Sequence, residues 1–344
     1  MQRSILLIYT GGTIGMKQDP ETLTLKPFNF NQILEEVPEL KKFGYIIDSI
    51  SFDPIIDSSD VSIEFWVELV SIIKNNYEKY DGFVILHGTD TMAFSASAIS
   101  FMLENLEKPI VFTGSQLPIG MLRTDGKENL ISSIEIAASR DETGKPFVPE
   151  VCIYFESQLY RGNRTTKYNA ENFRAFRSPN YPVLANVGIH IIYDKSAINY
   201  PRKWGKKLKV TTKLDTNVAI LKLFPGIGKE YVDAVLNIPN LRGLVLETFG
   251  SGNSPCLKWF LESIRKCIKR GVVVVNVTQC QAGSVDMEAY ANGLVLKKAG
   301  VVSGYDITTE SAITKLFFIL GRESDKKIIK SCIQSNLRGE ILNK

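Results

Sequence analysis

Glycine-rich turns bearing threonine follow two apolar runs of the chain and offer hydroxyl groups for nucleophilic chemistry. TGGTIG, near the N-terminus, contains Gly12 and Thr13, and HGTDT, further along, contains Thr89 and Asp90. A threonine hydroxyl can attack an acyl carbon if a base accepts its proton. Backbone N–H groups around Gly12 and Thr89 would stabilise the oxyanion that forms. The two turns together indicate acyl transfer, although TGGTIG alone is a weak signal.

A candidate base lies in the polar loop YRGNRTTK, which ends in Lys167. A lysine held neutral can accept a proton relayed through Thr89, with Asp90 positioning the amine. Positioned general-base catalysis contributes about 10²–10⁴-fold in rate. A lone lysine in such a loop is normally solvated, so the role of Lys167 depends on its lying beside HGTDT.

Two further turns supply groups that would bind a small substrate. DSSD contains Ser58 and Ser59 just before a helical pattern, and TGSQ contains Ser115 after another apolar run. Hydroxyl and backbone donors at a helix N-terminus suit a carboxylate. Helix capping is the alternative for DSSD, and also for Asp90 or Thr91 in HGTDT.

Other catalytic chemistries are poorly supplied. TGGTIG does not match the GxGxxG spacing, and no GK[ST] follows it, which argues against a phosphate-binding loop. The chain has only two histidines, too few for a typical catalytic metal centre. His87 suggests a Ser-His-Asp triad, but it ends an apolar run, so a packed structural histidine is the favoured interpretation.

The composition is that of an ordinary globular protein. A length of 344 residues suggests roughly two domains. The 41 basic and 37 acidic residues are spread along the chain, so neither a nucleic acid nor a membrane is expected as a partner. The first apolar run is too short for a signal peptide. Five cysteines without a CxxC pair favour a reducing compartment, and we predict a cytoplasmic protein.

Alternating apolar and amphipathic runs predict an α/β protein. Strands such as FVIL are apolar throughout, as in a parallel sheet that is buried on both faces. The first half is expected to form a right-handed, doubly wound and mostly parallel sheet, with the polar turns at its carboxyl edge. Its predicted strands are 4–9, 45–52, 83–87, 110–113, 151–155 and 189–193, and its predicted helices are 30–36, 62–77, 93–104 and 126–138.

A basic stretch, residues 195–213, interrupts the alternation. Its seven lysines and arginines would suit an anion-binding patch, but a solvated interdomain linker is the favoured interpretation. We therefore predict an N-terminal catalytic α/β domain at 1–194, a linker at 195–213, and a smaller C-terminal α/β domain at 214–344. The predicted strands of this second domain are 218–221, 244–247 and 272–277, and its predicted helices are 255–269, 307–320 and 325–335.

With TGGTIG, DSSD, HGTDT, TGSQLP and YRGNRTTK in this order, the chain resembles the bacterial cytoplasmic (type I) L-asparaginases. The resemblance extends through LFPGI, FGSGNSP, VVVNVTQC and NLRGE, and thus over essentially the full length. It implies hydrolysis of L-asparagine to aspartate and ammonia through an acyl-enzyme, without metal or organic cofactor. It also implies a homodimer or homotetramer whose active site is completed across the subunit interface.

The resemblance carries roles onto individual residues. It implies that Thr13 is the acylated nucleophile and that Thr89, Asp90 and Lys167 activate a nucleophile or water. The substrate-binding residues that it implies are Gly12, Ser58, Ser59, Gly88 and Ser115. Of these, the two serines of DSSD would bind the α-carboxylate and the Ser115 carbonyl the amide nitrogen, while Asp90 would meet the α-ammonium.

Two departures from the family pattern and two alternatives qualify this assignment. Leu23 stands about where many relatives carry a tyrosine that supports the nucleophile. Glu247 replaces an arginine of an intersubunit regulatory site, although Cys280 matches another position of that site. Since a reversed charge disfavours carboxylate binding, we predict weak or absent activation by asparagine. The alternatives are a catalytically silent amino-acid-binding regulatory protein and the asparaginase-like subunit of a tRNA-dependent amidotransferase; such subunits typically carry an additional N-terminal domain.

Overall fold

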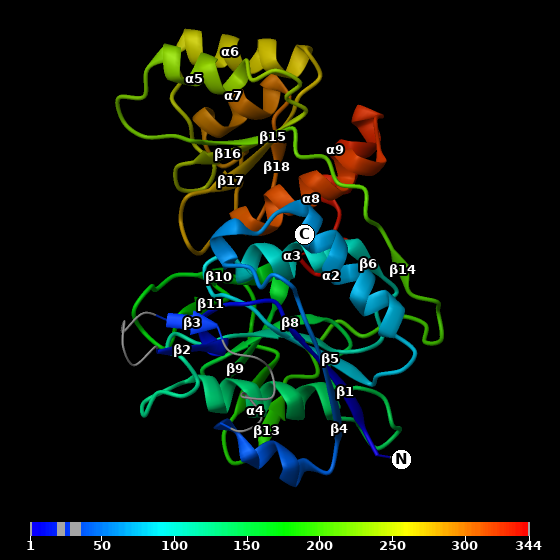
Figure 1. Ribbon diagram of the computed structural model, residues 1–344. Coiled ribbons are helices and arrows are strands. Elements are labelled where there is room, and N and C mark those ends of the chain that lie inside the picture. Colours follow the sequence, from blue (N-terminus) through cyan, green and yellow to red (C-terminus); the bar gives the residue numbers. More distant parts are fainter. Residues whose placement is uncertain (1, 19–24, 28–35, 343–344) are drawn as a thin grey trace. The chain divides into compact units, whose positions relative to one another are not determined.

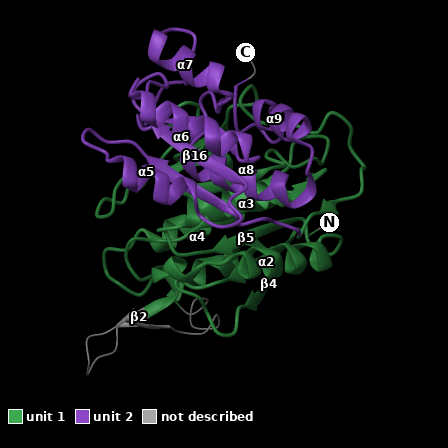
Figure 2. Cartoon of the chain, turned by 90° about the horizontal axis from the view of Figure 1, so that it is seen from above, with its two compact units in different colours: residues 1–212 green, residues 213–344 purple. Residues whose placement is uncertain are grey.

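The chain divides into two compact units, Met1–Thr212 and Lys213–Lys344 (Figure 2). The computed structural model describes residues 2–18, 25–27 and 36–342. The helix predicted at 30–36 and the position of Leu23 fall outside the described residues, apart from Glu36. The boundary between the units lies at the end of the basic stretch 195–213, and the functional domain limits stay a prediction.

An eight-stranded sheet forms the centre of the first unit (Figure 1). Its order is β13-β12-β9-β8-β7-β5-β1-β4. The five strands from β8 to β4 are parallel, and antiparallel pairing adds β9, β12 and β13. The strands are β1 Ser4–Tyr9, β4 Ile46–Ser51, β5 Gly82–Leu86, β7 Ile110–Thr113, β8 Val151–Phe155, β9 Gln158–Arg161, β12 Ala185–Val187 and β13 Ile191–Tyr193. This architecture confirms the mostly parallel α/β fold that the apolar strands predict.

Three helices cover this sheet: α2 (Ile63–Asn76), α3 (Met92–Met102) and α4 (Gly126–Ala138). The Ser62 hydroxyl caps α2 by accepting from the Phe65 N–H at 3.4 Å. The buried side chains of α2 recur at helical spacing, so one face packs inward. In α3, by contrast, nearly every side chain is buried.

The connection through α4 differs in hand from its neighbour. Leu86 and the following His87 point to opposite faces of the extended chain. His87 contacts Phe65 of α2 and Ser95 of α3, whereas Leu86 shares a core cluster with Leu130 of α4. Because β5, β7 and β8 follow one another in one direction across the sheet, α3 and α4 on opposite faces (Figure 1) make connections of opposite hand. The prediction of uniformly right-handed winding is therefore wrong for one connection, since a strand buried on both faces does not encode which face the next helix covers.

The predicted linker packs on the first unit. Within it, β14 (Lys209–Val210) pairs antiparallel with β6 (Leu103–Glu104). The Lys206 N–H donates to Glu107 Oε1 at 3.0 Å, and Asn105 Nδ2 donates to the Lys207 carbonyl at 3.2 Å. The stretch is thus held by hydrogen bonds although its lysines are mostly exposed.

The second unit is a four-stranded parallel sheet in the order β15-β16-β17-β18. Its strands are Val218–Lys222, Gly243–Thr248, Val273–Thr278 and Val302–Ser303 in that order. Its helices are α5 Lys229–Leu236, α6 Lys258–Lys269, α7 Ala291–Ala299, α8 Thr309–Arg322 and α9 Lys326–Gln334. The predicted strand at 189–193 corresponds to β13, whereas α5, α7 and the antiparallel strands β9 and β12 were not predicted. In the part of the chain that the structure describes, no helix is long and apolar enough to span a membrane.

Candidate active site

Close backbone contacts stack the turns that follow β1, β4 and β5. Gly12 has a φ of 91°, and a Cβ there would lie 2.5 Å from the Gly88 nitrogen. A Cβ on Gly88 would in turn lie 2.5 Å from Ser58 Oγ. Only glycine permits such approaches. TGGTIG, HGTDT and DSSD therefore meet at the carboxyl edge of the sheet, where ligands of open α/β folds bind.

Thr13 begins the 3-10 turn η1 (Thr13–Gly15) directly after this contact and is half-buried. The Tyr9 hydroxyl anchors the turn by donating to the Gly15 carbonyl at 3.0 Å. Burial raises the pKa of Tyr9 to about 12, so it remains a neutral donor. The Ile119 N–H donates to the Ile14 carbonyl at 3.3 Å, which ties the turn to the segment after TGSQ.

Lys167 lies against HGTDT, although it is distant in sequence. It ends the short strand β10 (Thr166–Lys167), which pairs with β11 (Phe176–Arg177). Its Nζ donates to Thr89 Oγ1 at 2.8 Å and to Asp90 Oδ1 at 2.6 Å. The lysine side chain is 16% exposed and the aspartate 67%. The predicted proximity of Thr89, Asp90 and Lys167 is thus observed, with the carboxylate open to solvent and the lysine mostly buried.

The capping interpretations have different outcomes. Asp57 caps η3 (Ser58–Asp60): its Oδ1 accepts from both N and Oγ of Ser59 at 2.8 Å. These bonds lower the pKa of Asp57. No such cap from Asp90 or Thr91 is present at α3. Thr91 Oγ1 instead donates to the Ser58 carbonyl at 2.6 Å, and this bond joins HGTDT to DSSD.

Gln116, which the sequence analysis did not single out, joins three loops. Thr89 Oγ1 donates to its Oε1 at 3.3 Å, and its Nε2 donates to the carbonyls of Ala170 and Asn172 at 3.0 and 3.2 Å. Its backbone N–H donates to both carboxylate oxygens of Asp125. The only signal in the sequence was its place directly after Ser115 in TGSQ. The neighbouring Ser115 is buried, and nothing in these contacts tests its role.

The site also offers unoccupied backbone donors. Among the residues that the structure describes, the N–H groups of Gly12 and Thr89 have no acceptor. Preorganised N–H groups of this kind stabilise the oxyanion of acyl transfer. Within the same described ranges, no group of three or more His, Cys, Asp or Glu side chains is placed to hold a metal ion.

Comparison with known proteins identifies the family. A model described as "Asparaginase, N-terminal" matches residues 4–199, and one described as "Glutaminase/Asparaginase C-terminal domain" matches residues 217–333. The chain belongs to the asparaginase family. It is 42% identical over 342 residues to L-asparaginase 1 of Escherichia coli (strain K12), covering 99% of this chain and 98% of that protein.

Two further similar proteins differ in how much of their length this chain covers. The 60 kDa lysophospholipase of Mus musculus is 40% identical over 366 residues, covering 99% of this chain but 63% of that protein. The crystal structure of L-asparaginase I from Vibrio cholerae O1 biovar eltor str. N16961 is similar with a TM-score of 0.89 at 38% identity, covering 100% of both chains. These matches confirm the family resemblance and the fold class.

Glu247, which departs from the asparaginase pattern, lies among the described residues. Its carboxylate has two partners nearby in the second unit. Thr309 Oγ1 donates to its Oε1 at 2.6 Å, and Lys222 Nζ lies 3.8 Å from its Oε2. Its side chain is 12% exposed. Cys280 is exposed, and its N–H donates to Thr278 Oγ1 at 3.0 Å. The carboxylate therefore already has partners within the second unit.

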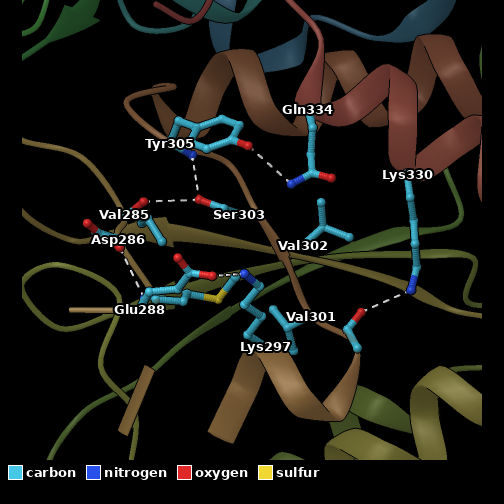
Figure 3. A pocket seen from close by; sticks show the side chains of 12 residues that line it. Val285, Asp286, Glu288, Lys297, Val301, Val302, Ser303, Tyr305, Lys330 and Gln334 are labelled. Carbon is cyan, nitrogen blue, oxygen red and sulfur yellow. Dashed lines mark hydrogen bonds and ion pairs between the residues drawn. The ribbon is translucent and has the colours of Figure 1, made fainter. Parts of the chain in front are cut away.

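A pocket of about 430 Å³ in the second unit contains none of the predicted site residues (Figure 3). Lys330 Nζ donates to the Gly300 carbonyl at 3.1 Å. Lys297 forms an ion pair with Glu288. Since its lysines already have such partners, the pocket offers no free cation that would mark it as an anion site.

Proposed function

We propose that the protein hydrolyses L-asparagine to L-aspartate and ammonia, with Thr13 as the nucleophile. The observation that supports this most strongly is the convergence of two threonine turns. Gly12, which precedes Thr13, packs on Gly88, while the next residue, Thr89, accepts a hydrogen bond from Lys167. A nucleophile, a proton relay and a base thus come from three separate segments of one unit.

Substrate binding uses the polar groups around this convergence. Ser58 and Ser59, with the backbone of η3, would bind the α-carboxylate, and Asp90 would bind the α-ammonium. The Ser115 carbonyl would accept from the side-chain amide nitrogen. Opposite charges on the substrate would thereby be matched by donors at one end and a carboxylate at the other. Such binding places the amide carbon beside Thr13.

In the acylation half, Thr13 Oγ attacks the amide carbon, and its proton passes through the Thr89 hydroxyl to Lys167 and from there to the leaving nitrogen. The C–O bond forms, an oxyanion develops, and the N–H groups of Gly12 and Thr89 stabilise it. Collapse of this intermediate breaks the C–N bond and releases ammonia. The product is an aspartyl ester of Thr13.

In the deacylation half, water attacks this ester. Lys167 accepts the water proton through the Thr89 hydroxyl, and Asp90 holds the amine in place. The ester C–O bond breaks, the proton returns to Thr13 Oγ, and aspartate leaves. Before the reaction, the Thr89 hydroxyl donates its proton to Gln116 Oε1. Gln116 is therefore a second acceptor for this proton besides Lys167.

We further propose a homodimer or homotetramer in the cytoplasm, without nucleic acid or membrane partners and without a cofactor. The family membership supports the oligomer. A silent amino-acid sensor has no use for a nucleophile, which argues against that alternative. An amidotransferase subunit would pass its ammonia to a partner protein and require that partner for turnover.

The decisive experiment measures ammonia release by the purified protein from asparagine and glutamine over a wide concentration range. We expect turnover without a partner protein and a preference for one of the two amides, since a methylene difference is typically worth about 1–3 kcal/mol. Thr13→Ala should abolish turnover while the circular dichroism spectrum is retained. Thr143→Ala, which removes an exposed hydroxyl of a turn, is the matched control. Binding of asparagine without turnover by the unmodified protein would reject the hydrolase assignment.

A further inference from the structure

His87 is a buried histidine that the catalytic scheme above does not use. It is 1% exposed and directly precedes the Gly88–Thr89 peptide of HGTDT. The rings of Phe65 and Phe112 lie edge-on to its imidazole, with centroids at 5.5 and 5.8 Å. Burial lowers its pKa to about 4, so the ring is neutral at neutral pH. The expectation of a packed histidine is confirmed, but its polar contacts point to more than packing.

The hydrogen bonds of His87 allow only one neutral tautomer. Its Nδ1 lies 2.6 Å from the Gly88 carbonyl oxygen, which can only accept, so Nδ1 carries the proton. Its Nε2 then carries the lone pair and accepts from Ser95 Oγ at 2.9 Å. Ser95 Oγ in turn accepts from Trp66 Nε1 at 3.0 Å. The imidazole is thus fixed at both nitrogens.

This arrangement determines the direction of the Thr89 N–H. In a trans peptide, the carbonyl and the following N–H point in opposite directions. Because His87 holds the Gly88 carbonyl on its own side, the Thr89 N–H points away from the imidazole. Gly88 packs on Gly12, and in the described part of the chain this N–H has no acceptor.

We propose that His87 is a positioning residue, which holds the Gly88–Thr89 peptide so that the Thr89 N–H is directed at the developing oxyanion. The proposal rests on the proposed function, because it needs acyl transfer at Thr13. His87 would touch neither substrate nor water. Its effect would come from orientation, since an oxyanion donor is worth most when it needs no reorganisation during the reaction.

Three variants test this proposal. His87→Phe keeps a planar ring but loses the donor to Gly88, and we expect kcat for asparagine to fall about 10–100-fold, somewhat less than the loss of a whole oxyanion donor. KM should change little, because the interaction is made in the transition state. His87→Asn places an amide nitrogen near the position of Nδ1 and should recover most of kcat. Trp66→Phe, which removes the outermost donor of the network, is the control for destabilisation alone.

A second readout separates positioning from packing. In an asparagine analogue with an aldehyde in place of the side-chain amide, Thr13 Oγ should add to the aldehyde carbon and form a tetrahedral oxyanion. His87→Phe should weaken the binding of this analogue by the same factor by which it lowers kcat. It should leave inhibition by the product aspartate unchanged. If His87→Phe does not fold, His87→Gln, whose amide reaches the Nε2 position instead, replaces it with the same expectation.

The proposal is overturned if His87→Phe keeps the kcat of the unmodified protein, if His87→Asn is no better than His87→Phe, or if Trp66→Phe loses as much kcat as His87→Phe. Failure of the proposed function looks different. In that case the unmodified protein releases no ammonia, or Thr13→Ala retains turnover.

Discussion

The lysine–carboxylate pair Lys167–Asp90 of the first unit and the pair Lys315–Glu340 of the second differ in burial and in hydrogen-bond partners. Lys167 in the first unit pairs with Asp90 at 2.6 Å, and the aspartate is 67% exposed. Lys315 in the second unit pairs with Glu340 at 2.5 Å, and both side chains are 0% exposed. The residue types are similar, but the surroundings allow different roles.

The buried pair leaves no donor for another partner. Besides Glu340, Lys315 Nζ donates to the carbonyls of Ile333 and Ser335 at 2.8 and 2.7 Å. Burial lowers the pKa of Lys315, while Glu340 opposes that shift. Glu340 also accepts from the N–H of Leu337. The NLRGE motif therefore has a structural explanation: it closes the C-terminal segment onto α8.

The exposed pair has the opposite character. Lys167 shares its donors between the Thr89 hydroxyl and a carboxylate that is largely open to solvent. Exposed ion pairs contribute little to stability, typically about 0–1 kcal/mol. A solvent-accessible carboxylate and a hydroxyl partner therefore mark the catalytic candidate, whereas complete burial marks the structural pair.

The largest effect is expected from substitution of Lys167, and it should fall on catalysis. Lys167→Met should lower kcat by about 10²–10⁴-fold, because it removes the proposed base. The free energy of unfolding should change by only about 1 kcal/mol, because the carboxylate of the ion pair is largely solvated and loses little when its partner is removed. Ammonia-release kinetics and urea denaturation measure the two quantities, with the exposed Lys145→Met as control. A large loss of stability would show that this pair, too, is structural.

The complementary prediction concerns Glu340. Glu340→Ala should lower the free energy of unfolding by about 3–5 kcal/mol, because it leaves a buried ammonium without its counter-charge. Urea denaturation at neutral pH measures the loss. The double variant Lys315→Met/Glu340→Leu should recover most of it, because neither charge is then buried. An unchanged unfolding free energy for the single variant would contradict the contrast drawn between the two pairs.

A smaller effect, on the stability of the fold at acidic pH, is expected from the neutral His87 beside the site. The pKa of His87 is about 4 in the folded protein, against an ordinary value of 6.5. Above pH 6.5 the ring is neutral in both states and contributes no pH dependence. Between pH 6.5 and 4 the unfolded chain binds more protons, so stability falls as the pH falls, by about 3 kcal/mol over the full range.

Denaturation of the unmodified protein and of His87→Asn at pH 7 and pH 4.5 isolates this contribution. The variant should lose less stability on acidification, since the other titrating groups are common to both proteins. Equal acid sensitivity of the two proteins would show that the buried imidazole takes up protons as readily as a solvated one.

The smallest effect is expected at Glu247, which is already bonded to Thr309. Its charge disfavours binding of a carboxylate there, so asparagine saturation should be hyperbolic. Initial rates over a wide asparagine range measure the curve. Clear sigmoidality would show that a regulatory site functions despite this residue, and Glu247→Gln should then strengthen it.

Local sequence patterns were sufficient to locate the polar turns and several of the strands that carry them. Continuous apolar runs and glycine-rich punctuation are local properties, and they correctly located β1, β7, β8 and α4 and the order of the polar turns. The meeting of Thr89, Asp90 and Lys167 followed from the resemblance and is observed. The catalytic and binding roles of the predicted residues stay predictions.

The packing of distant segments sets which face of the sheet α4 covers, brings Gln116 to three loops and places Lys315 beside Glu340. It also decided the direction of the His87 ring and, through it, of the Thr89 N–H. Each of these depends on a partner far away in sequence. Local patterns report whether a residue is buried and in which kind of element, because those depend on periodicity. They do not report which distant group completes a hydrogen bond, because that depends on how the elements pack together.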